Sequence, residues 1–210
     1  MKKMMTWVEQ KLAPKMNGFG TNPWISSIQE AILAALPATY VGSIATLIST
    51  FRSLGLEFLP DLSQLSNFSF GLFGLFLAYL IPSTIMDKKK NKKLAKQSGM
   101  ASLGLFLLLC YPQMEGTSIT FEFSTFGSGG MLTALISGYI TAIIMNLFSK
   151  KSFFKEDTAM PAFIVTWFDA IIPWSLVLLI GIVVRFTFQI DLITVIRTVF
   201  QPLTAFGQSF

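Results

Sequence analysis

Few side chains in this sequence are suited to chemistry. The 210 residues contain no histidine and a single cysteine, Cys110. The absence of histidine excludes an imidazole general base, a serine-histidine pair and a histidine-ligated zinc ion. One cysteine also excludes an intramolecular disulfide and a cysteine-based metal cage. We therefore assign no catalytic residue, metal ligand or cofactor from the sequence, and we expect Cys110 to be a small buried side chain.

Four polar residues stand at the edges of long apolar runs, and they are the candidates for any transport-linked polar site: Glu30, Asn146, Asp169 and Arg185. Carboxylates are favoured near helix N-termini, so a helix-start role is the interpretation we favour for Glu30 and Asp169. A membrane enzyme would need several titratable groups to converge. The sequence identifies no such group of catalytic residues.

The elements that must position these residues are apolar helices. Hydrophobic residues make up 52% of the chain and charged residues 13%, about half the charge of an ordinary soluble domain. A membrane span needs roughly 20 apolar residues, and one charge at its centre costs about 2.5–3.5 kcal/mol. Five runs carry no charge: 31–51, 62–86, 97–114, 123–149 and 170–184.

These runs predict an all-α, polytopic membrane protein with about five transmembrane helices, over 28–51, 67–86, 97–114, 127–148 and 168–188. Together they form a membrane domain over 24–189. Two flanking segments, 1–23 and 190–210, have the apolar period of amphipathic helices lying on a membrane surface. The alternation over 117–125 predicts a short extended segment outside the membrane.

Lysine placement predicts the orientation. Of the sixteen Lys and Arg residues, thirteen lie before the first span, between the second and third, or after the fourth. The positive-inside rule then places the N-terminus in the cytoplasm and 190–210 at the outer face. The residues that carry this prediction are Lys88, Lys89, Lys90, Lys92, Lys93, Lys150 and Lys151.

The same lysines could attract nucleic acid phosphates, but their position between two apolar spans favours the topological interpretation. We expect no nucleic-acid partner. Membrane lipid is the expected partner, and anionic lipid headgroups are a secondary ligand for these lysines.

Small residues recur at helical spacing in two spans. The first span carries Ala34, Ala38 and Gly42, and the fourth carries Gly130, Ala134 and Gly138. Such stripes let helix backbones approach closely where hydrophobicity no longer separates helix from lipid. They predict either packing within one chain or the seam of a homodimer.

Several short motifs resemble, in order along nearly the whole chain, the lactose/cellobiose family of bacterial phosphotransferase permeases, the IIC component. The clearest are Asn22-Pro23-Trp24, Leu36-Pro37, Val41-Gly42-Ser43, Phe126 to Met131, Met160-Pro161-Ala162 and Phe200-Gln201-Pro202-Leu203. The resemblance implies a multi-pass permease in the bacterial cell membrane. It also implies a homodimer that imports a disaccharide of the cellobiose, chitobiose or lactose type, which cytoplasmic IIB and IIA subunits phosphorylate.

Members of that family are about twice as long, and their sugar-binding residues lie in the second half. The resemblance therefore implies that these residues form the N-terminal scaffold and dimerisation half, which is not expected to transport sugar alone. The substrate-binding residues are expected in the absent C-terminal half. The alternative is a small membrane scaffold or interaction protein that does not transport.

Overall fold

The computed structural model describes residues 20, 22–150, 152, 154 and 160–199. The expected N-terminal amphipathic segment, except for Gly20, Asn22 and Pro23, lies outside the described residues. So does the part of the C-terminal segment from residue 200 onward. Within that segment a helix covers 192–199, and its Ile193 is buried in the apolar core.

The first described helix, α3 (Pro23–Ser53), is the longest in this part of the chain, with 31 residues. It begins where Asn22 accepts a hydrogen bond from the Trp24 backbone N–H at 3.0 Å and Pro23 follows, as is typical of a helix start. Pro37 lies inside it. The chain then returns through α4 (Ser63–Asn67) and a 3-10 turn (Phe70–Leu72) into α5 (Phe73–Lys88).

Three more long helices follow α5. They are α6 (Lys92–Leu109), α7 (Met131–Phe148) and α8 (Ala162–Ile182), which continues as a π-helix over Val183–Thr187. Between α6 and α7 lie a hairpin of β1 (Gln113–Glu115) and β2 (Ser118–Thr120) and two 3-10 turns (Phe123–Phe126 and Ser128–Gly130). The strands are antiparallel, with Gln113 opposite Thr120. Gly116 adopts a φ of 60° in the tight turn that joins them.

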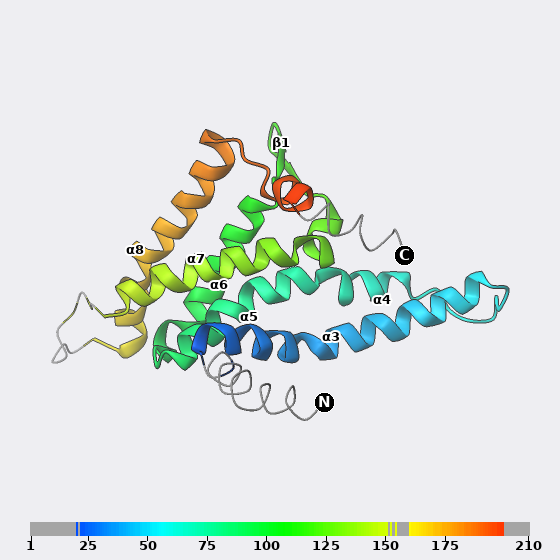
Figure 1. Cartoon of the computed structure of the whole chain (residues 1–210), viewed down its shortest axis with the longest axis horizontal. Helices are drawn as coiled ribbons and strands as arrows, with labels where there is room; N and C mark the ends of the chain where they lie inside the picture. The colour runs from blue at the N-terminus through cyan, green and yellow to red at the C-terminus, as the bar shows by residue number, and fades with distance from the viewer. Residues whose placement is uncertain (1–19, 21, 151, 153, 155–159, 200–210) are drawn as a thin grey trace, which may run out of the picture.

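Helix α5 is the centre of the bundle, because it packs against α3, α6 and α7, while α8 packs on α6 and α7. One apolar cluster joins α3, α5 and α7, and a second joins α6 and α8. The second half of α3 projects beyond the other helices (Figure 1). We call residues 40–58, which form that projection, the α3 arm.

Four helical stretches are long and apolar enough to cross a membrane: Pro23–Ser53, Ser63–Lys88, Ser128–Phe148 and Ala162–Thr187. The all-α prediction is confirmed, with a two-stranded hairpin as the only sheet in the described residues. Helix α6 corresponds to the remaining expected span, but its 18 residues include three lysines, Lys92, Lys93 and Lys96.

The expected extent of that third span, 97–114, differs from the structure at its end. The helix stops at Leu109, and residues from Gln113 onward form β1. Tyr111 has a φ of 57°, which a continuing α-helix does not allow, and Pro112 has no N–H to donate. The extended segment expected over 117–125 is a strand only at Ser118–Thr120, since Phe123–Phe126 forms a 3-10 turn.

Candidate functional site: the helix stripes and the lysine end

The small-residue stripe of α7 is buried within the chain. Gly130, Ala134, Gly138 and Ala142 are all buried, with Ala134 and Ala142 at 0% exposure. A Cβ added at Gly138 would lie 2.9 Å from Cγ2 of Ile81 on α5. A Cβ added at Gly130 would collide with the carbonyl oxygen of Thr125. Glycine at these two positions therefore lets α7 approach α5 and the preceding 3-10 turn closely.

The stripe of α3 is placed differently. Ala34 is exposed and Ala38 is half-buried. Gly42 is buried, and a Cβ there would lie 2.5 Å from Cβ of Phe70. The residues that α3 buries in the chain share only Gly42 with the predicted stripe: Ser27, Ala31, Ala35, Gly42 and Ala45.

A second packing seam, which the sequence analysis missed, is made of hydroxyl side chains. Ser102 on α6 donates to Ser137 on α7 at 3.4 Å, and both are fully buried. Thr133 and Thr141 lie one turn to either side of Ser137 and are buried as well. Their spacing of four residues on one charge-free helix was the signal available in the sequence, since small hydroxyl residues are enriched where membrane helices pack.

The end of α5, the turn that follows it and the start of α6 carry Lys88, Lys89, Lys90, Lys92 and Lys93, and we call this segment the lysine end. Lys88 forms a salt bridge with Glu30 of α3 at 2.8 Å and donates to the Ser26 hydroxyl at 2.9 Å. The Lys89 ammonium lies 5.5 Å from the centroid of the Trp24 ring. These contacts tie the start of α3 to the end of α5, so both helix ends lie on one side of the bundle.

The same turn is also tied to α7. Asn91 donates its side-chain amide to the side-chain oxygen of Asn146 at 3.1 Å. Lys150, an exposed residue, follows Asn146 about one helical turn later, and Lys151 lies outside the described residues. Two of the four candidate polar residues, Glu30 and Asn146, therefore bind the lysine end rather than a common site within the bundle.

The other two candidates lie apart. Asp169, on α8, accepts from the Ser152 hydroxyl at 2.8 Å, and it lines a cavity beside the lysine end. Arg185 lies near the opposite end of α8, where its guanidinium donates to the Pro112 carbonyl at 2.8 Å and stacks over the Tyr111 ring at 3.5 Å. Arg185 is thus held on the chain segment after α6, away from the other three candidates.

The cavity beside the lysine end has a volume of about 880 Å³. It lies between the α5–α6 turn and the start of α8. Its polar lining includes Lys90, Lys92 and Lys93, and its apolar lining includes Leu94 and Val165. No group of three or more His, Cys, Asp or Glu in the described residues is arranged to hold a metal ion.

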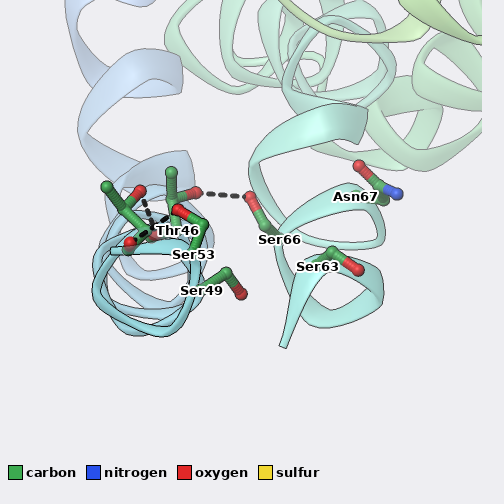
Figure 2. Close-up of a pocket in the computed structure, with 7 residues that line it drawn as sticks. Thr46, Ser49, Ser53, Ser63, Ser66 and Asn67 are labelled. Carbon is green, nitrogen blue, oxygen red and sulfur yellow. Dashed lines mark hydrogen bonds between the residues drawn. The ribbon is translucent and has the colours of Figure 1, made fainter. Parts of the chain in front are cut away.

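A second, smaller hollow of about 290 Å³ lies between the α3 arm and α4. Figure 2 shows Ser66 of α4 opposite Thr46 of α3, and their hydroxyls are 2.7 Å apart. Thr46 and Thr50 also donate to carbonyls one turn earlier on α3. A hydrogen bond from a side-chain hydroxyl to the carbonyl one turn earlier satisfies that donor on an apolar helix. The presence of these hydroxyls beside the hollow is therefore explained by helix structure.

Comparison with known proteins identifies the family. The family model described as "Phosphotransferase system, EIIC" matches residues 29–201, which is more than half of the chain. The chain belongs to the EIIC family. The suspected resemblance to phosphotransferase permeases is thus confirmed, and the chain is a multi-pass membrane protein of a bacterial family.

Individual EIIC relatives align with almost the whole chain. The lactose-specific EIICB component of Staphylococcus epidermidis is 27% identical over 221 residues, covering 97% of this chain and 37% of the relative. The lactose-specific EIICB component of Staphylococcus aureus is 25% identical, with 97% and 38% covered. The chain thus spans little more than a third of the length of these curated relatives.

A solved EIIC structure shares the fold. The crystal structure of the transporter ChbC, the IIC component from the N,N'-diacetylchitobiose-specific phosphotransferase system, superimposes with a TM-score of 0.76 at 22% identity. The match covers 96% of this chain and 52% of that transporter. The described helices therefore have the arrangement of about half of an EIIC transporter.

Proposed function

We propose that this chain is the N-terminal scaffold half of a sugar permease that imports a disaccharide coupled to its phosphorylation. The observation that carries the proposal is the EIIC family match over 29–201. The named relatives act on lactose and on N,N'-diacetylchitobiose, both of which are disaccharides. A disaccharide of the lactose, cellobiose or chitobiose type is accordingly the proposed substrate of the complete permease.

The interior of the described bundle supports a scaffold role. Its buried polar residues are all serines and threonines: Ser27, Ser69, Ser98, Ser102, Thr125, Thr133, Ser137 and Thr141. Gln97 and Arg185 are less buried as residues, although the Gln97 Oε1 and Arg185 Nε atoms are themselves buried. Sites that discriminate sugars need several convergent hydrogen-bonding groups facing a cavity. Two of these hydroxyls, Ser102 and Ser137, instead join α6 to α7, which supports helix packing.

We infer that the chain forms a homodimer through α3. The α3 arm exposes large apolar side chains, among them Tyr40 at 62%, Ile44 at 59%, Leu47 at 58% and Phe51 at 50%. Only 22% of the most apolar part of the whole helix α3 (Pro23–Ser53) is buried within the chain. Lipid covers the rest of the apolar helix surface in this proposal, and a second copy covers part of α3 near the exposed Ala34.

We also infer that the N-terminus and the lysine end face the cytoplasm, in accordance with the positive-inside rule. The start of α3 and the lysine end share one side of the bundle, because the Lys88–Glu30 salt bridge joins them. Cytoplasmic IIB and IIA subunits, which would deliver the phosphoryl group, would then meet the permease on this side.

Two experiments test the scaffold proposal. Calorimetric titration of the purified chain with cellobiose, lactose and chitobiose should show no saturable binding, while the intact lactose-specific EIICB component of Staphylococcus epidermidis, as the control, should bind lactose. Saturable binding by the chain alone would overturn the proposal.

The second experiment exchanges the aligned region of that EIICB component for this chain. A chimera that reaches the membrane and takes up lactose supports a permease scaffold. A chimera present at the control level in the membrane but inactive favours the alternative, a non-transporting membrane scaffold.

A further inference from the structure

The cavity beside the lysine end has two chemically different parts. Lys90, Lys92 and Lys93 come from the turn between α5 and α6. Leu94 and Val165, together with Met160 and Ala162, give the remainder an apolar lining. The cavity therefore lies at the boundary between the apolar helices and the charged end of the bundle, and its lining suits an amphiphile with an anionic head.

The lysines of the turn divide into two groups. Lys88 and Lys89 are occupied by contacts with α3, through Glu30 and the Trp24 ring. In the described part of the chain, Lys90, Lys92 and Lys93 form no salt bridge, although all three line the cavity. These three ammonium groups are therefore available to a ligand.

The acidic residues of the lining leave a net positive charge. Asp87 and Asp169 are the two carboxylates there, against three lysines. Asp169 lies on α8 and is already hydrogen-bonded by the Ser152 hydroxyl. An anion among the three lysines is thus favoured electrostatically.

Backbone and side-chain contacts fix the turn from which the three lysines project. Lys90 adopts a φ of 62°, a conformation that glycine or asparagine adopts at lower cost. The Asn91 backbone N–H donates to the Met86 carbonyl at 2.9 Å, while its side chain is fixed by Asn146. Asn91 consequently gives α6 no side-chain cap, so the first N–H groups of α6 add to the positive field at Lys92 and Lys93.

We propose that this cavity binds a phosphate group, and that its source is the headgroup of an anionic phospholipid. The lysines would contact the phosphate oxygens, and Leu94 and Val165 would contact the first carbons of the acyl chains. Basic pockets between membrane helices bind anionic headgroups for the same reason. This inference does not depend on sugar transport, so it can fail or succeed independently of the proposed function.

The test uses the full chain in an uncharged detergent. Short-chain phosphatidylglycerol, short-chain phosphatidylcholine and inorganic phosphate are titrated separately, and bound lipid is counted by native mass spectrometry while the melting temperature is followed. Phosphatidylglycerol should bind saturably and raise the melting temperature, because a ligand of the folded state stabilises it. Phosphatidylcholine and inorganic phosphate should have much smaller effects.

Matched variants identify the site. The K92Q/K93Q variant should bind phosphatidylglycerol about tenfold or more weakly, since each lysine near a headgroup contributes to affinity. The K96Q/K150Q variant removes the same charge outside the cavity lining and should bind normally. The K90G variant serves as a second test, because glycine suits the φ of 62° and the fold is expected to be kept.

Three results would overturn the proposal. The first is equal binding of phosphatidylcholine, and the second is unchanged phosphatidylglycerol binding in both K92Q/K93Q and K90G. The third is a response to inorganic phosphate as strong as the response to lipid, which would reject the lipid as the source.

Discussion

Helices α3 and α7 carry stripes of small residues with the same spacing, yet the two stripes have different surroundings. The stripe of α7 is buried against α5 and the turn before α7. On α3 only Gly42 is closely packed, whereas Ala34 is exposed. Equal spacing on two apolar helices therefore does not determine which of them packs within the chain.

The difference follows from position in the bundle. Helix α7 lies beside the central α5, so its small face meets another helix backbone within the chain. Helix α3 is longer and extends beyond α5 (Figure 1), where it packs on α4 and leaves large apolar side chains such as Ile44 and Leu47 exposed. In a membrane such a face contacts either lipid or another protein, since both are apolar.

The largest expected effect comes from Gly138→Leu on α7. A Cβ added at Gly138 would lie only 2.9 Å from Ile81 Cγ2, so the larger leucine side chain would push α7 away from α5. Overpacking of a tight contact typically costs about 1–3 kcal/mol. Thermal unfolding in detergent should show a clear fall in melting temperature.

The matched control is Ala34→Leu on α3, at an exposed position of the other stripe. Its melting temperature should stay close to that of the unchanged chain. An equal fall in melting temperature in both variants would show that the two stripes are packed alike, and the difference between α3 and α7 would then be rejected.

The second prediction concerns the surface of α3 in a dimer. In a C110A background, a cysteine at Ile44, which is 59% exposed, should cross-link two copies in membranes. A cysteine at Ala142, which is 0% exposed on α7, should not. Electrophoresis without reductant gives the readout. If cysteines placed along the whole exposed face of α3 all gave monomer only, the proposed dimer contact through α3 would be rejected.

A smaller effect is expected where the lysine end meets α7. Asn91→Ala removes the hydrogen bond to Asn146, and an intramolecular hydrogen bond contributes about 0.5–1.5 kcal/mol. The free energy of unfolding should fall by that amount. A double-mutant cycle with Asn146→Ala isolates the pair, and additive losses would show that the two amides do not interact.

The contact of the lysine end with α3 should contribute less to the stability of the chain than its contact with α7. Glu30→Gln removes a salt bridge whose glutamate is 59% exposed. Exposed ion pairs contribute about 0–1 kcal/mol and weaken with salt. We expect a small loss of stability at low ionic strength that disappears at high salt. A loss that persists at high salt would indicate that this pair is shielded from solvent.

The smallest effect is in the loop between the α3 arm and α4. The Ser63 backbone N–H donates to the Asp61 carboxylate at 2.9 Å, which lowers the pKa of Asp61 below its ordinary value of 3.8. The resulting stabilisation is present above pH 3.8 and is lost as pH falls through the lower folded-state pKa. NMR titration should place the Asp61 midpoint below 3.8, and Ser63→Pro, which lacks the N–H, should raise it.

The sequence alone determined the class of protein, a multi-pass bundle of apolar helices. Charge-free runs of about 20 residues have one stable solution in hydrocarbon, because a helix satisfies its own backbone hydrogen bonds. The lysine clusters likewise predicted that the α5–α6 turn and the start of α3 share a side, and the Lys88–Glu30 salt bridge joins these two segments. Both inferences rest on local composition.

The tertiary structure decided which surfaces are used. It buried the stripe of α7 and left Ala34 exposed, ended α6 at Leu109, and fixed Arg185 on the Pro112 carbonyl. It also formed a cavity from three lysines and the start of a helix 70 residues further along the chain. Such contacts join segments far apart in sequence, and no local pattern specifies which neighbour a helix face will meet.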